Sequence, residues 1–388
     1  MSILAWGALG VAGLYFALLL ALALRAYFGI DRLAALPLPS RSQWPRLSLV
    51  TPARDEAASL EAAVRSRLES DYPDLEIVLV DDRSRDATGD IADQLAAHDP
   101  RVQAIHVAAL PAGWLGKVHA LARGAEAASG EWLLFTDADV HFSPDALRRA
   151  VGYCEDRRLD FLAAFPDLWS GGLWIDVAIS SLLRSLSLGT RRRAIEDPTS
   201  RASAGSGVFN LVRRSVLART AGFESLKLEV IDDACLAQMV KRSGARCSIV
   251  QACGLVGLHY YRSLGEMVRG GEKNAFALVG RFRLVPLLLA SAVLLALAWA
   301  PLLAIAAGGR YAIAGALLLG LDWAGALVLA AWLRRPLLPA LLTPIGSSIG
   351  VYIALRSGAL ALRHGGIAWR DTFYSLTDLR AGARFKLF

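Results

Sequence analysis

The sequence has few cysteines, and their spacing matches no metal-binding or redox motif. The four cysteines form no CxxC pair and have no histidine partner at zinc-site spacing: Cys154, Cys235, Cys247 and Cys253. A disulfide framework and a thiolate metal cluster are therefore not expected. We predict reduced cysteines that pack inside a cytosolic domain. Internal repeats and low-complexity tracts are lacking too.

Charge is also scarce. Charged residues make up 20% of the chain and hydrophobic residues 55%, with a mean hydropathy of +0.41. This composition is too apolar for an ordinary soluble domain and too charged for a chain that lies wholly in lipid. The net charge of +7 does not indicate nucleic-acid binding, because no groove-reading or base-stacking motif accompanies it. Basic residues in membrane proteins collect on the cytosolic side, which favours a membrane protein with one soluble domain.

The first long segment, residues 3–24, contains no charge at all. About 20 apolar residues span a bilayer as a helix. A secretory signal would begin with basic residues, whereas here Arg25 and Arg32 follow the apolar run. We therefore predict a membrane anchor over residues 1–27, with the chain from residue 25 onward in the cytosol.

Apolar character returns near the C-terminus. Three candidate spans, at residues 285–307, 312–333 and 338–361, lie within a membrane region predicted over residues 284–362. The last contains Pro339, Pro344 and Gly346, which predicts a broken or re-entrant segment. The tail at 363–388 is basic, which favours the cytosol and hence a last segment that does not fully cross.

A further apolar stretch, residues 173–189, is interrupted by Asp176 and Arg184. An amphipathic helix at the membrane surface is the interpretation that we favour, with the arginines at 191–193 at headgroup level. The interfacial region is thus predicted over residues 173–193.

Between the membrane regions, short hydrophobic strands alternate with helical patterns. Strands are predicted at residues 47–51, 77–80, 102–107 and 132–136, and helices at 57–69, 88–97 and 121–128. This alternation predicts an α/β domain with a mostly parallel sheet covered on both faces. Such sheets bind ligands beyond the carboxyl ends of their strands.

Acidic residues follow three of these strands. Asp55 and Glu56 come after the first, Asp81 and Asp82 after the second, and the pair Asp137 and Asp139 after the strand at 132–136. A turn or a helix cap can account for any one of these sites, but three together favour a binding site.

The pair Asp137 and Asp139 is the sharpest signal. Residues i and i+2 of an extended chain point the same way, so both carboxylates can converge on one cation. Mg²⁺ takes one or two carboxylates plus substrate phosphates, and Mn²⁺ suits the same oxygen ligands. Such an ion neutralises the charge that develops on a diphosphate leaving group. The sequence therefore predicts a Mn²⁺ or Mg²⁺ site.

Four motifs in this order carry a family resemblance: VTPARDE at residues 50–56, VDDRSRDAT at 80–88, FTDAD at 135–139 and IDD at 231–233. The sequence resembles family 2 glycosyltransferases of the GT-A fold, a Rossmann-like fold, which implies a cytosolic domain over residues 45–275. The segment GWLGK at 113–117, followed by Ala120, is similar to the lipid-glycosylating members, which are hopanoid-associated, carotenoid and ceramide glycosyltransferases.

The resemblance implies roles for individual residues. The nucleotide-sugar donor, expected to be a UDP-sugar, would be bound by Pro52, Ala53, Glu56, Asp81, Asp82, Lys117, Asp137 and Arg269. Asp137 and Asp139 would hold the metal. Asp55 stands where the family usually has Asn, a departure that weakens the assignment of this loop.

The acceptor needs a base, because a hydroxyl is a poor nucleophile near neutral pH. The family's Glu-Asp position is occupied by Asp232 and Asp233; Asp233 would be the base, although either residue could cap the following helix. The remaining implied residues border the donor sugar and the acceptor: Gly205, Ser206, His259 and Glu266. For His259 a place in an aromatic core is an equal alternative.

Processive synthases of this family carry Gln-x-x-Arg-Trp, and here that register reads Glu266 to Gly270 with Arg269 retained. The missing Trp predicts transfer of a single sugar to the hydroxyl of a membrane lipid, on the cytosolic face of the cell's inner membrane. One carboxylate base with a metal-bound leaving group favours direct displacement with inversion, as the resemblance also implies. The alternatives are a processive polysaccharide synthase, a non-catalytic membrane scaffold and a nucleotidyltransferase.

Overall fold

The computed structural model describes residues 2–187 and 191–385, and it divides into two compact units. We call residues 31–169, 192–258 and 381–388 the sheet unit, and residues 1–30, 170–191 and 259–380 the helical unit. The stretch expected as one domain, 45–275, is thus shared between the units, because 170–191 and 259–275 group with the apolar helices.

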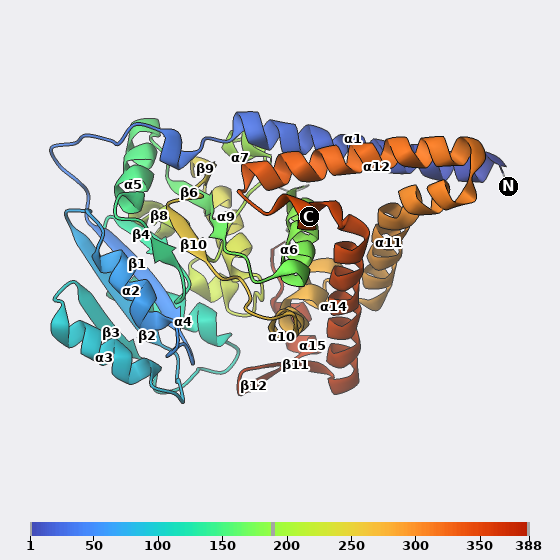
Figure 1. Cartoon of the computed structure of the whole chain (residues 1–388). Coiled ribbons are helices and arrows are strands. Elements are labelled where there is room, and N and C mark those ends of the chain that lie inside the picture. The colour runs from blue at the N-terminus through green and yellow to red at the C-terminus, as the bar shows by residue number, and fades with distance from the viewer. Residues whose placement is uncertain (1, 188–190, 386–388) are drawn as a thin grey trace. The chain divides into compact units, whose positions relative to one another are not determined.

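The sheet unit is built on seven strands in the order β3-β2-β1-β4-β8-β6-β9 (Figure 1). Their bounds are β1 Leu47–Ala53, β2 Leu75–Asp81, β3 Val102–His106, β4 Trp132–Phe135, β6 Phe161–Phe165, β8 Asn210–Arg213 and β9 Cys247–Gln251. Only β8 among them runs antiparallel to its neighbours. The predicted mostly parallel α/β sheet is confirmed.

Helices connect and cover these strands. They are α2 Leu60–Leu68, α3 Thr88–His98, α4 Gly116–Ala127, α5 Ala146–Arg157, α7 Arg192–Glu196, α8 Arg214–Leu217 and α9 Asp232–Arg242. A second, three-stranded sheet has the order β5-β10-β7, from His141–Phe142, Val256–Leu258 and Asp167–Leu168. Helix α4 begins five residues before the predicted position 121, because Gly116 lets its first turn lie against Asp82. A Cβ at Gly116 would lie 2.2 Å from Asp82 Oδ2.

The two faces of the sheet are buried, which leaves the ends of its strands as the place where polar groups can gather. The strand residues Leu49, Ile77 and Trp132 are fully buried, as expected of strands covered on both faces. The chain leaves β1 for β2 on one side and reaches β4 on the other, so β1 and β4 flank a topological switch point. Ligands of open α/β sheets bind at the carboxyl ends of the strands there.

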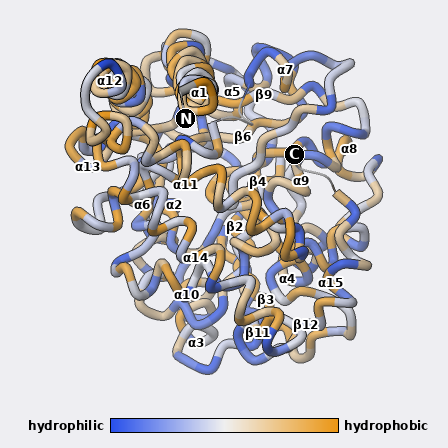
Figure 2. Tube along the Cα trace, turned by 90° about the vertical axis from the view of Figure 1, so that its right-hand side faces the viewer, coloured by the Kyte–Doolittle hydropathy of each residue, from blue (hydrophilic) through white to orange (hydrophobic). Residues whose placement is uncertain are grey.

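Four helices of the helical unit are long and apolar enough to cross a membrane: α1 Ser2–Gly29, α11 Leu284–Ala307, α12 Gly309–Trp332 and α14 Thr343–His364. Figure 2 shows hydrophobic residues along α1 and α14. Helices α1 and α12 run side by side (Figure 1), and a Cβ at Gly325 would lie only 3.3 Å from the Cα of Leu20.

The last apolar segment is broken, as the prolines predict. It consists of α13 Leu337–Leu341 and α14, which meet at Leu342, just before Pro344. That this last segment does not fully cross the membrane stays a prediction. The tail forms further structure that the sequence did not suggest: a hairpin of β11 Gly366–Trp369 and β12 Thr372–Ser375, then α15 Leu376–Gly382. Lys386 of the tail lies outside the described residues.

Helix α6, Leu173–Ser187, covers the described part of the predicted interfacial stretch; residues 188 and 189 lie outside it. The two charges that suggested an interfacial position are buried in ion pairs. Asp176 Oδ1 lies 2.5 Å from Arg335 Nη2, and Arg184 Nη2 lies 2.5 Å from Asp322 Oδ1 of α12. The interfacial position stays a prediction, but these charges bind α6 to the other helices.

Candidate active site

Carboxylates from one strand end and one helix start meet at Lys117. The Lys117 ammonium, on the first turn of α4, lies 2.7 Å from Asp137 Oδ1 and 3.5 Å from Asp232 Oδ2. Asp137 follows β4, and Asp232 begins α9. Together with Asp233 they line a small cavity. Burial opposes the charge on Lys117, but Asp137 and the two aspartates of α9 outweigh it and raise its pKa. The lysine is therefore a permanent cation.

Asp233 is held by backbone groups. Its Oδ2 accepts a 2.8 Å hydrogen bond from Gly207 N, and its Oδ1 accepts one of 2.8 Å from Ala234 N. Burial, and then the neighbouring carboxylate of Asp232, raise the pKa of Asp233 to about 6. At neutral pH this carboxylate is ionised yet more basic than an ordinary aspartate, which suits a general base.

The loop at residues 204–207 fits closely around Asp233. A Cβ at Gly205 would lie 2.1 Å from the Asp233 carbonyl oxygen, so only glycine fits there. Asn210 fixes the same loop from β8: its Oδ1 accepts from Ser206 N at 2.9 Å, and its Nδ2 donates to Asp233 O at 3.3 Å. Sequence reasoning had not singled out Asn210.

Of the two candidate metal residues, Asp137 lines the same cavity as Asp233, and Asp139 follows it two residues later. Asp137 N donates to Gly207 O at 3.0 Å, and a Cβ at Gly207 would lie 2.8 Å from Asp137 Oδ2, so glycine keeps space beside this carboxylate. Burial, and then the charge of Asp137, raise the pKa of Asp139. No group of three or more metal-binding side chains occurs among the described residues. Two carboxylates fit a Mg²⁺ or Mn²⁺ ion that takes its remaining ligands from phosphate and water.

At the next strand end, β2 places Asp81 opposite Ala53 of β1. Asp81 Oδ1 accepts from Ser84 N at 3.0 Å, and Oδ2 lies 3.1 Å from His106 Nδ1. His106 Nε2 lies 2.9 Å from Asp93 Oδ1, and these two carboxylates raise the pKa of His106, Asp93 first. His106 was not predicted, and its place at the end of β3 was the available signal.

Asp82 is paired with arginines of the same edge. Arg83 Nε lies 2.8 Å from Asp82 Oδ1, and Arg54 Nη1 lies 3.7 Å from Oδ2. Asp55, the departure from the family pattern, has φ of 54°. Asn and Asp both tolerate this left-handed conformation, so the replacement keeps the backbone requirement of the loop.

The other residues predicted for the donor lie at the same edge. Pro52 ends β1 together with Ala53, and both are buried. Glu56 N donates to Thr88 Oγ1 at 2.8 Å, and Glu56 Oε2 accepts from Ser59 Oγ at 3.1 Å. Pro52 and Ala53 thus pair with β2, whereas Glu56 lies at the start of α3. The role of the three residues in nucleotide binding stays a prediction.

Three predicted site residues belong to the helical unit, so their roles stay predictions: Arg269, Glu266 and His259. Glu266 has a local function in α10, Leu264–Ala275. Its N donates to Ser263 Oγ at 3.1 Å and its Oε2 accepts from Arg262 N at 2.8 Å, which caps the helix.

Gly270 does not leave open the space where the synthases have Trp. A Cβ at Gly270 would lie 2.7 Å from Tyr261 Cε1, so the Tyr261 ring covers this position. Tyr260 packs edge-on against Tyr261 with ring centroids 4.8 Å apart. The Tyr261 ring, from the loop before α10, therefore fills the space beside Gly270, and the single-sugar product expected from the missing Trp stays a prediction.

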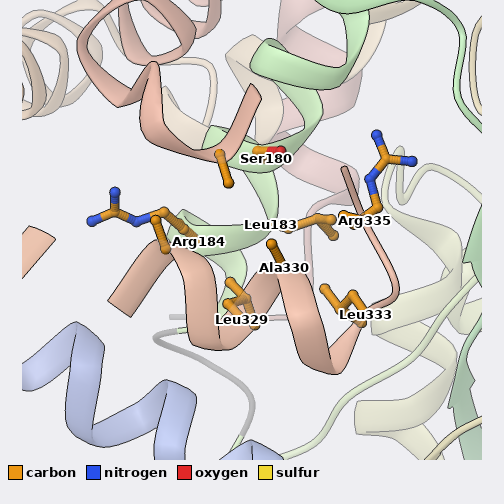
Figure 3. A pocket seen from close by; sticks show the side chains of 9 residues that line it. Ser180, Leu183, Arg184, Leu329, Ala330, Leu333 and Arg335 are labelled. Carbon is orange, nitrogen blue, oxygen red and sulfur yellow. The ribbon is translucent and has the colours of Figure 1, made fainter. Parts of the chain in front are cut away.

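A second small cavity lies within the helical unit, between α6, α12 and α13 (Figure 3). Its walls include Leu183, Leu329 and Ala330, and Figure 3 shows the guanidinium groups of Arg184 and Arg335 at opposite sides of it. This largely apolar lining offers no set of charged groups for a nucleotide.

The geometry of the sheet unit agrees with a family comparison. Residues 48–220 match the model of Glycosyl transferase family 2. The chain carries a family 2 glycosyltransferase domain. The match includes the strand ends at Ala53, Asp81 and Asp137 and ends before α9.

The relatives are similar over part of their length. The uncharacterized glycosyltransferase EpsJ of Bacillus subtilis is 31% identical over 118 residues, which is 30% of this chain and 33% of that protein. The beta-monoglucosyldiacylglycerol synthase of Synechocystis is 33% identical over 112 residues, 28% of this chain and 23% of that protein. The chain thus matches a third or less of each.

A solved structure resembles most of the chain. The mannosyltransferase PcManGT from Pyrobaculum calidifontis, in complex with GDP-Man and Mn²⁺, has a TM-score of 0.55 and 21% identity. The likeness covers 89% of this chain and 99% of that one. It shows that the two proteins share a fold, and the predicted GT-A fold is confirmed.

Proposed function

We propose that this protein transfers a single sugar, with inversion, from a nucleotide-sugar donor to the hydroxyl of a membrane lipid. The observation that carries the proposal is the acidic cluster at the switch point of the sheet. Asp233, held by two backbone N–H groups, has its pKa raised to about 6, and it lines the same cavity as Lys117 and Asp137. A base, a fixed cation and a metal-binding carboxylate are what glycosyl transfer requires.

Each group has a defined part in the reaction. Asp233 takes the proton from the acceptor hydroxyl as its oxygen forms a bond to the anomeric carbon. The bond from that carbon to the diphosphate breaks, and its electron pair leaves with the nucleoside diphosphate. Lys117 stabilises the departing negative charge. A Mn²⁺ or Mg²⁺ ion held by Asp137 and Asp139 would neutralise the same phosphates. One displacement by one base inverts the anomeric configuration.

The nucleotide would lie along the neighbouring strand ends, where Asp81 and Asp82 face Ala53 and Arg54. We infer a UDP-sugar from the family resemblance, with Arg269 as a further ligand of the diphosphate.

A lipid acceptor is supported by the helical unit. Four of its helices have the length and composition of membrane spans, so an acceptor dissolved in the bilayer is accessible to the chain. The segment at 113–117 resembles lipid-glycosylating enzymes, and one relative is named for glucosyldiacylglycerol synthesis. Arg25 and Arg32 after the first apolar run favour a domain on the cytosolic side of the inner membrane.

A processive synthase is the second candidate, and the Tyr261 ring over Gly270 gives it an aromatic surface that the sequence did not suggest. Stacking on an aromatic face is a means of holding a growing glycan. The number of sugars in the product separates the two candidates.

The test uses membranes that contain the full chain and a panel of labelled nucleotide sugars, with Asp139→Ala as the control. We expect one labelled lipid that carries one sugar, release of a nucleoside diphosphate, and no product from Asp139→Ala. Mass spectrometry of the lipids and the released nucleotide gives the answer. A ladder of sugars would support the processive synthase, and release of a sugar phosphate would indicate nucleotidyl transfer. Full activity of Asp139→Ala would overturn the metal assignment.

A further inference from the structure

A fully buried arginine lies behind the loop that carries Asp137 and Asp139. Arg67 is 0% exposed and comes from α2, which lies against the sheet (Figure 1). Its Nη2 donates to Asp137 O at 2.7 Å and to Val140 O at 3.0 Å, and its Nε donates to Val140 O at 3.2 Å. Its Nη1 donates to Thr51 Oγ1 at 2.8 Å. The guanidinium thus joins β1 to both ends of the loop.

This arrangement differs from an ordinary buried ion pair. In the part of the chain that the structure describes, the oxygens that accept hydrogen bonds from Arg67 are all neutral. A buried charge without a counter-ion is costly unless hydrogen bonds satisfy it, and here neutral carbonyl and hydroxyl oxygens do so. Burial lowers the pKa of Arg67 to about 10, and the nearby Asp139 and Asp137 oppose this fall, so the side chain stays protonated at neutral pH.

The sequence places Arg67 where an apolar side chain is expected. In α2 the buried positions Leu60, Ala63, Val64 and Arg67 follow helical spacing, so the arginine stands on the core stripe of the helix. An apolar residue would pack there without the cost of burying a charge. The cost suggests that the hydrogen bonds to the loop serve a purpose beyond packing.

We propose that Arg67 is a positioning residue, which fixes the backbone from Asp137 to Val140 so that the carboxylates of Asp137 and Asp139 converge on a metal ion. This inference rests on the proposed function, because it assigns the loop to metal binding. Two of the oxygens that accept from the Arg67 guanidinium are the carbonyls of Asp137 and Val140, on either side of Ala138 and Asp139. One rigid, planar group therefore sets the distance between these two carbonyls. Lysine cannot replace it, because a single ammonium cannot reach acceptors on Thr51, Asp137 and Val140 in the same planar arrangement.

A matched control exists at the other end of β4. Arg214 also holds backbone carbonyls: its Nε donates to Gly130 O at 2.7 Å, and its Nη2 donates to Ala128 O. The carbonyls that Arg214 binds precede β4, whereas the carbonyls that Arg67 binds follow it. Arg214→Lys therefore disturbs two guanidinium–carbonyl bonds of the same kind without touching the candidate metal loop.

The experiment compares Arg67→Lys, Arg214→Lys and the wild type as full-length protein in detergent. Mn²⁺ binding in the presence of UDP is measured by electron paramagnetic resonance, and amide hydrogen exchange of residues 136–141 is measured without metal. We expect Arg67→Lys to weaken Mn²⁺ binding about 10–100-fold, the range typical of groups that orient metal ligands, and to speed exchange in the loop. Arg214→Lys should leave both unchanged.

Thr51→Val provides a milder variant should Arg67→Lys not fold. It removes the oxygen that accepts from Arg67 Nη1 while keeping a side chain of similar shape, and it should weaken Mn²⁺ binding in the same direction by a smaller factor. Unchanged binding and exchange in the folded variants, or an equal loss in Arg214→Lys, would overturn the inference alone. A wild type that binds neither Mn²⁺ nor UDP would reject the proposed function and this inference together.

Discussion

In the helical unit, each buried carboxylate meets one guanidinium. Asp176 pairs with Arg335, and Asp322 pairs with Arg184 and also accepts a hydrogen bond from Thr343 Oγ1 at 2.5 Å. These two aspartates are the buried acids of this unit among the residues that the structure describes. Each charge is compensated inside the protein, so the arrangement is complete without a ligand.

The sheet unit gathers its carboxylates differently. Asp137, Asp139, Asp232 and Asp233 lie near one ammonium group, that of Lys117. The nearby guanidinium of Arg67 is occupied by neutral oxygens. The cluster therefore holds an excess of negative charge.

The two arrangements of charge differ in their effect on stability. Paired charges hold helices together, and their removal in pairs can be tolerated. An excess of like charge costs stability; after burial, which is the larger cause, the neighbouring carboxylates raise the pKa values of Asp139 and Asp233. Under the proposed function, such an excess would be compensated by a metal cation and by the proton that the base takes from the acceptor. Three predictions test this comparison.

The largest effect is expected for Asp233→Asn. Loss of the base should lower kcat by at least about 10²–10⁴-fold, while nucleotide binding remains. The variant removes one like charge but replaces one oxygen that accepts a backbone N–H with an NH₂ group, so its two effects on the stability of the ligand-free protein oppose each other. Turnover and nucleotide affinity are measured by product formation and calorimetry. A collapse of nucleotide affinity would place Asp233 in the donor site instead.

Asp322→Asn in the helical unit is expected to destabilise the protein. It leaves Arg184 buried without its counter-ion, and breaking a buried pair from one side typically costs about 3–5 kcal/mol. The double variant Asp322→Leu with Arg184→Met should recover most of this loss. Thermal unfolding in detergent gives the comparison. An Asp322→Asn variant as stable as the wild type would show that the pair does not hold these helices.

The smallest effect is a graded pH dependence. The pKa of Asp233 is raised in the folded protein, so folding favours its protonated form; the stability that this gives is lost as pH rises from about 4 through about 6. Activity has the opposite sign, because the base must be ionised, and it should fall about tenfold per pH unit below about 6. Melting temperature and kcat/KM between pH 5 and pH 7.5 provide the measurement. Parallel changes in both quantities would contradict the assignment.

Much of the fold followed from pattern. The apolar runs predicted the membrane-length helices, and alternating strands and helices predicted the sheet, because burial on both faces leaves near-continuous hydrophobic strands. The predicted ends of the helices and strands were less accurate. Helix α4 begins at Gly116 because of its fit against Asp82, which is a tertiary contact that the local sequence does not express.

The candidate site shows the same division. Asp81, Asp137 and Asp139 were predictable, since strand ends converge at one edge of a parallel sheet. His106, Asn210 and Arg67 were missed, because each bonds to a partner distant in sequence: Asp81, Asp233 and the loop of Asp137. For Arg67, the charged residue on the apolar stripe of α2 was a usable signal.

By itself, the sequence determined the membrane helices, the parallel sheet and the acidic strand ends, because hydrophobic periodicity and run length act locally along the chain. Only the tertiary structure decided how charge is balanced. It paired Asp322 with Arg184 and turned the Arg67 guanidinium onto the loop of Asp137. These partners come from separate parts of the chain, and packing alone brings them within reach of one another.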